Sequence, residues 1–161
     1  MVEYINALEL VLFGLAFWFS RSKYTPGILI CYNLWVWFMN GETGARMEYI
    51  NKLYYAGTYT YQKANTEVMI LYLQVGITCG IFAAVAILLK TRLSYLTGLV
   101  ILAQSALQLL VGMCIYYEVT YNIDVSKIID THFVIDGFFV ILYVLIAWMC
   151  VYWSRKTSNY D

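Results

Sequence analysis

The sequence has few charged residues, and this shortage decides the class of protein. Asp, Glu, Lys and Arg make up 12% of the 161 residues, whereas hydrophobic residues make up 62%. A water-soluble domain carries about 25% charged residues, so this chain has too few to cover a surface in water. Lipid is the solvent that fits. The composition predicts an all-α integral membrane protein, with residues 1–161 forming a single transmembrane helical domain.

Motifs that carry chemistry are also missing. One histidine, His132, cannot supply both axial ligands of a membrane haem, and neither an HExxH nor a CxxC motif is present. No nucleophile elbow, phosphate-binding loop or dinucleotide fingerprint occurs. Ten basic residues balance ten acidic ones, which speaks against a nucleic-acid-binding surface. We therefore expect no catalytic residues, metal site or cofactor, and a chain that is not an enzyme.

Long apolar stretches are what the sequence does have. A transmembrane helix needs about 20 apolar residues, and the single proline, Pro26, leaves these stretches without obvious internal breaks. We expect a bundle of about five transmembrane helices, at about 2–20, 24–40, 68–89, 94–117 and 132–154.

Six of the ten basic residues lie in alternate connections between these spans and after the last one: Arg21, Lys23, Lys90, Arg92, Arg155 and Lys156. The other four, Arg46, Lys52, Lys63 and Lys127, lie on the opposite side among seven acidic residues. This pattern predicts that the N-terminus lies outside and the C-terminus inside the membrane. The expected location is a bacterial inner (cytoplasmic) membrane, although an organelle membrane would give the same pattern.

The connection over residues 41–67 is long enough to hold structure of its own. Met47, Ile50 and Leu53 recur at helical spacing beside charged residues, which predicts a short helix lying on the outer membrane surface. A tyrosine-rich run follows at residues 54–61. These tyrosines are read either as interfacial anchors or as a surface for a partner.

Polar side chains recur at one depth in the predicted spans, roughly 6 to 14 Å below the outer surface. They are Glu9, Asn33, Gln74, Gln108 and Asp136, and Gln104 lies one turn from Gln108 on the same helix face. If their helix faces converge, the bundle contains a polar layer that opens outward. Glu9 and Asp136 are costly in lipid, and no Lys or Arg lies at their depth, so a proton or a small cation is the expected partner.

Three functional readings follow. The first is an oligomeric channel- or transporter-like protein in which the polar layer binds protons or small cations. In the second, the same amides and acids serve only as hydrogen bonds between helices. The third is a non-catalytic structural or accessory subunit of a larger membrane complex, and a phage-encoded or immunity protein would have a similar sequence. Partners are accordingly the lipid bilayer and either further copies of the chain or other membrane subunits.

A series of small residues indicates close helix packing. Gly76, Gly80 and Ala84 repeat every four residues, and such a series allows a neighbouring backbone to approach. The partner helix belongs either to the same chain or to another copy.

Overall fold

The computed structural model describes the chain except residues 1, 90, 122–125 and 159–161. The described part consists of helices and short links and contains no strand. The helices are α1 (Val2–Phe19), α2 (Tyr24–Tyr55), α3 (Tyr61–Leu88), α4 (Arg92–Tyr121) and α5 (Ser126–Ser158). The predicted all-helical class is confirmed.

Among the described residues, three helical segments are long and apolar enough to cross a membrane: Tyr61–Leu88, Arg92–Glu118 and Val134–Lys156. A fourth apolar segment, Tyr4–Phe19, is shorter. Every backbone N–H and C=O must be satisfied inside a bilayer, and a helix meets this requirement within itself. The chain is therefore compatible with a multi-pass membrane protein.

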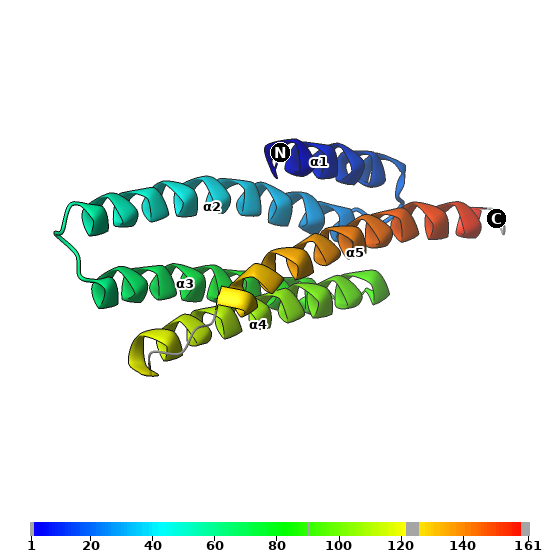
Figure 1. Cartoon of the computed structure of the whole chain (residues 1–161). Helices are drawn as coiled ribbons and strands as arrows, with labels where there is room; N and C mark the ends of the chain where they lie inside the picture. The colour runs from blue at the N-terminus through cyan, green and yellow to red at the C-terminus, as the bar shows by residue number, and fades with distance from the viewer. Residues whose placement is uncertain (1, 90, 122–125, 159–161) are drawn as a thin grey trace.

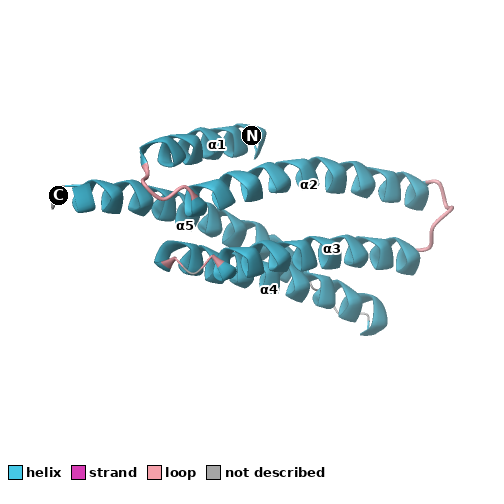
Figure 2. Cartoon of the chain, turned by 180° about the vertical axis from the view of Figure 1, so that it is seen from behind, coloured by secondary structure: helices cyan, strands magenta, loops and turns pink. Residues whose placement is uncertain are grey.

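The helices run back and forth along one direction (Figure 1). α3 and α4 share the most extensive interface, and α5 contacts α1, α2 and α4. The α1–α2 link, the α3–α4 turn and the end of α5 lie toward one end of the molecule, whereas the α2–α3 connection lies at the other (Figures 1 and 2). This alternation brings residues from distant parts of the sequence together at each end.

The structure differs from the prediction over residues 41–67, where a loop with a separate interfacial helix was expected. α2 continues unbroken to Tyr55 and α3 begins at Tyr61. The two helix ends instead pack on each other through buried Ile50, Ala64 and Leu71. This pairing buries Ile50 and packs Met47 beside it, two of the three apolar residues that suggested a surface helix. The end of α2 and the start of α3 extend beyond the other helices at this end of the molecule and form a projecting helical hairpin (Figure 1).

The link of this hairpin has a defined geometry. Gly57 adopts a φ of 72°, a left-handed conformation that glycine accepts without strain. Thr60 then caps α3, and its Oγ1 accepts a hydrogen bond from the Lys63 N–H at 3.2 Å. The Lys63 ammonium lies 4.2 Å from the centre of the Tyr59 ring. The tyrosine-rich run therefore contributes to the turn itself.

Small residues allow α3 and α4 to approach closely. A Cβ atom on Gly76 would lie 2.8 Å from the Leu109 side chain, and one on Gly80 would lie 3.4 Å from Ser105 Oγ. Ser105 Oγ also donates a hydrogen bond to the Gly76 carbonyl at 2.7 Å. Ala84 is exposed. Gly76 and Gly80 thus face α4 of the same chain, whereas Ala84 does not.

The tightest contact of this interface involves a glycine that the sequence pattern did not single out. A Cβ on Gly98 would lie 2.6 Å from Ile87 Cγ1 and 2.9 Å from the Ala83 carbonyl oxygen. Ala83, rather than Ala84, is the fully buried alanine of this pair. The closest approach of α3 and α4 is therefore near the turn that joins them.

Candidate functional site

A cavity of about 680 Å³ lies between the helices and collects polar side chains from four of them. The polar lining residues are Asn6, Glu9, Tyr32, Asn33, Asn40, Gln104, Gln108, Asp136 and Tyr143. α3 contributes apolar Val75 and weakly polar Cys79. Five of the six predicted polar residues line this one cavity; Gln74 does not.

Glu9 and Asn33 join α1 to α2 inside the cavity. Both residues are buried, with 6% and 4% of their surface exposed. Asn33 Nδ2 donates a hydrogen bond to Glu9 Oε2 at 2.9 Å. The short link between the two helices reverses the chain direction and so places the two side chains opposite each other. A buried acid is thus held by a neutral amide.

Two amide atoms beside this pair have no hydrogen-bond partner among the described residues. They are Asn33 Oδ1 and Asn6 Nδ2. Asn6 lies three residues before Glu9, which places both on one face of α1. Buried polar groups are nearly always hydrogen-bonded, so an unpartnered acceptor and an unpartnered donor at a cavity wall indicate a place where a small polar species can bind.

Gln104 is the centre of a second group. Its Oε1 accepts hydrogen bonds from Tyr143 at 2.6 Å and Tyr32 at 2.8 Å. Its Nε2 donates to Asp136 Oδ1 at 3.2 Å, and Gln108, one turn further on, donates to Asp136 Oδ2 at 3.5 Å. The amide oxygen of Gln104 accepts and its amide nitrogen donates, so the network fixes how Gln104 and Asp136 are oriented.

Tyr32 and Tyr143 are functional candidates that the sequence analysis missed. Both are buried, and their rings meet edge to face with centroids 5.6 Å apart. Tyr32 also lies 3.4 Å from Cys79 Sγ through its hydroxyl. Tyr143 follows Asp136 by seven residues, a spacing that puts both on the same face of α5. That spacing was the available signal.

The cavity has an acidic character. Glu9 and Asp136 line it, and none of the described residues that line it is Lys or Arg. A carboxylate in a low-dielectric site needs a proton, hydrogen-bond donors or a cation to offset its charge. The arrangement is therefore suited to binding protons or small cations and unsuited to binding anions.

Metal-ligating clusters are a separate matter. Within the described part of the chain, no group of three or more His, Cys, Asp or Glu residues is placed to hold a metal ion. The four cysteines are free thiols. The side chain of His132 lies outside the described residues.

Gln74 points away from the cavity. Its side chain is exposed, and its backbone carbonyl accepts a hydrogen bond from Thr78 Oγ1 at 2.9 Å. The cavity face of α3 instead carries Val75 and Cys79, four residues apart. Neighbouring positions on a helix differ by about 100° in direction, which is why Gln74 and Val75 face different surroundings.

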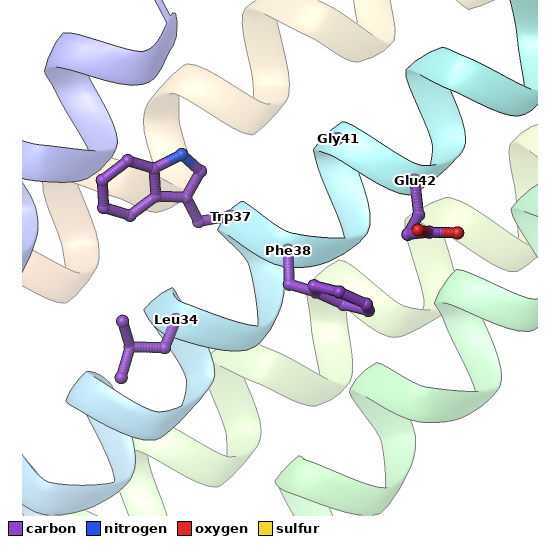
Figure 3. A pocket seen from close by; sticks show the side chains of 5 residues that line it. All are labelled: Leu34, Trp37, Phe38, Gly41 and Glu42. Carbon is purple, nitrogen blue, oxygen red and sulfur yellow. The ribbon is translucent and has the colours of Figure 1, made fainter.

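A second pocket, of about 470 Å³, lies along α2. Figure 3 shows its five lining residues, Leu34, Trp37, Phe38, Gly41 and Glu42, all from this one helix. Leu34 and Phe38 are exposed. The pocket is mostly apolar and gathers no polar groups from different helices, so it is a weaker candidate for a functional site than the polar cavity.

No known protein-family model, curated protein or solved structure matches the chain.

Proposed function

We propose that this chain is a small polytopic membrane protein, channel- or transporter-like, that binds protons or small cations in the polar cavity. One observation carries the proposal. Glu9 from α1 and Asp136 from α5 line the same cavity, and the described part of its lining contains no basic residue. Two acids 127 positions apart in sequence reach one site only because the helices fold back on each other.

The proposal includes five membrane-crossing helices with the N-terminus outside. The structure supports this topology through the distribution of charge. Arg21, Arg92 and Lys156 come from three distant segments and line one pocket. Such a gathering of basic residues is typical of the cytoplasmic end of a membrane protein. The projecting hairpin at the other end would then lie outside.

Glu9 and its neighbours supply the chemistry that the proposal needs. Carboxylate and amide oxygens are the ligands that small hard cations prefer, and a carboxylate also accepts a proton. Glu9 provides the charge, and the unpartnered Asn33 Oδ1 provides a neutral oxygen on the adjacent helix. Asp136 is bound by two amides. We therefore assign the first binding step to Glu9 and a supporting charge to Asp136.

Chemical labelling tests this assignment. A hydrophobic carbodiimide modifies protonated carboxyl groups in apolar surroundings, and mass spectrometry of the digested protein identifies the labelled residue. We expect Glu9 to react several-fold faster than Glu67, the matched acidic control outside the cavity lining. Bound cations that replace the proton should slow labelling of Glu9 alone. Equal reactivity of the two residues, with no cation effect, would contradict the proposal.

A second candidate function is that of a structural or accessory subunit. The hairpin favours it, because Tyr49, Tyr55 and Tyr61 are exposed there, with Tyr55 at 84%, and tyrosine is enriched at protein interfaces. Gly76 and Gly80 are less suited to a partner because α4 already contacts them. Native mass spectrometry of protein purified from its source decides between the two. Stoichiometric recovery of other subunits, lost in Tyr55→Ser, would favour the accessory role over transport.

A further inference from the structure

A pocket of about 480 Å³ lies where three distant segments meet: the α1–α2 link, the α3–α4 turn and the last turns of α5. Its lining includes Arg21, Arg92 and Lys156, one basic residue from each segment. None of the described lining residues is acidic. The pocket is thus opposite in charge to the polar cavity and separate from it in lining residues.

Two helix N-termini contribute to the same pocket. Ser22 precedes α2 and Thr25 lies in its first turn. Arg92 begins α4, whose end is capped by Thr91, since Thr91 Oγ1 accepts a hydrogen bond from the Ser94 N–H at 3.1 Å. The N-cap residue of α2, Lys23, makes no capping hydrogen bond with its side chain. The first N–H groups of a helix lack partners within that helix, and the helix dipole is positive there, so such ends bind anions.

The walls of the pocket are held in place by hydrogen bonds. Arg21 N donates to Ser154 Oγ at 3.0 Å, and Ser154 Oγ donates to the Cys150 carbonyl at 2.8 Å. Thr25 is buried, with 2% of its surface exposed. These contacts fix the α1–α2 link against α5, so the fold sets where the backbone of Arg21 lies relative to that of Lys156.

Lys23 shows that not every basic residue at this end belongs to the pocket. Its ammonium donates hydrogen bonds to the carbonyls of Phe17 and Trp18. It therefore satisfies the C-terminal end of α1, where the dipole is negative. Arg21, Arg92 and Lys156 differ from Lys23 because they line the pocket, where hydroxyl-bearing residues lie beside them.

We propose that this pocket binds a phosphate group, either as the headgroup of an anionic phospholipid or as a soluble phosphate. Arginine forms paired hydrogen bonds to phosphate oxygens, and Arg21 and Arg92 approach from different segments. Lysine adds a point charge, and the first N–H groups of α2 add further donors. Trp153, which also lines the pocket, offers an apolar surface of the kind found at headgroup level.

Native mass spectrometry tests the lipid source. The protein is purified in a neutral detergent, mixed with phosphatidylglycerol at increasing ratios, and the bound lipids are counted. We expect wild type to retain one more lipid than the double variant Arg92→Gln, Lys156→Gln, with an apparent affinity at least tenfold higher. The matched control, Arg46→Gln with Lys63→Gln, removes the same charge from the hairpin and should bind within twofold of wild type.

A second arm tests the soluble source. Inorganic phosphate is added in zwitterionic micelles, and the melting midpoint is compared with that in sulfate at equal ionic strength. A phosphate-specific rise in wild type, absent from the pocket variant, would identify a soluble phosphate; a response to phosphatidylglycerol alone would identify a lipid headgroup.

Two results would overturn the proposal. One is equal lipid retention by wild type and the pocket variant with no phosphate response, and the other is an equal loss in the hairpin control. Arg92 and Lys156 are exposed, so the variants should fold. The single variants Arg92→Gln and Lys156→Gln provide the same comparison if the double variant aggregates.

Discussion

Replacing Gly98 by alanine should destabilise the protein, because the added Cβ has no room. It would lie 2.6 Å from Ile87 Cγ1 and 2.9 Å from the Ala83 carbonyl oxygen. A side chain can rotate away, but a backbone oxygen of α3 moves only if the two helices separate. Overpacking costs about 1–3 kcal/mol, and alanine recovers up to about 1 kcal/mol of helix propensity. We expect a net loss of about 1–2 kcal/mol in the free energy of unfolding.

Gly14→Ala is the matched control for this change. A Cβ on Gly14 meets nothing within 4 Å, so the helix-propensity term should act alone and leave stability unchanged or raised by up to about 1 kcal/mol. Unfolding in mixed micelles, followed by circular dichroism as a denaturing detergent is added, measures both variants. If Gly98→Ala were as stable as Gly14→Ala, the close approach of α3 and α4 would be wrong.

Two further substitutions test the polar network and the hairpin. Gln104→Leu removes the acceptor of two buried hydroxyls and a donor to Asp136, and each unsatisfied group costs about 1–3 kcal/mol. In the same unfolding assay it should be less stable than Gln74→Leu, which changes an exposed side chain; equal stability of the two would refute the network. Ile50→Ala removes part of the small hairpin core, where such truncations cost about 2–5 kcal/mol. Hydrogen exchange should accelerate in the hairpin but not around the cavity, and an unchanged hairpin rate would refute the pairing.

Composition and helical spacing predicted the class of fold because both reflect the lipid in which the chain is expected to fold. A chain with so little charge has to satisfy its backbone within helices if it lies in lipid. Helical rise converts sequence position into distance along a helix, and this predicted a common level for the polar residues. Glu9, Asn33 and Asp136 do line one cavity.

The direction of individual side chains was harder to predict. Gln74 shares the depth of the other polar residues, yet it lies on a different face of α3 from Cys79. A single polar residue marks a depth, whereas its direction depends on how the helix is rotated against its neighbours. The same rotation decides that Gly76 contacts α4 while Ala84 is exposed.

The hairpin was missed because its signal does not resemble that of a transmembrane span. Glu48 and Lys52 form an exposed ion pair at 2.8 Å along α2, so this part of the helix is polar, and an interruption after residue 40 was inferred. Only the contact between Ile50 and the start of α3 shows why the helix continues. Such a contact depends on residues that are distant along the chain.

The flux of protons and small cations through purified protein in sealed vesicles tests the central claim most directly. Wild type, Glu9→Gln, Asp136→Asn and Glu67→Gln are compared at equal protein density under an imposed membrane potential, with dyes for pH and for monovalent cations. We predict a flux in wild type and Glu67→Gln that falls at least tenfold in Glu9→Gln and also declines in Asp136→Asn. A flux unchanged by both cavity substitutions, or none in wild type for any ion tested, would contradict the account.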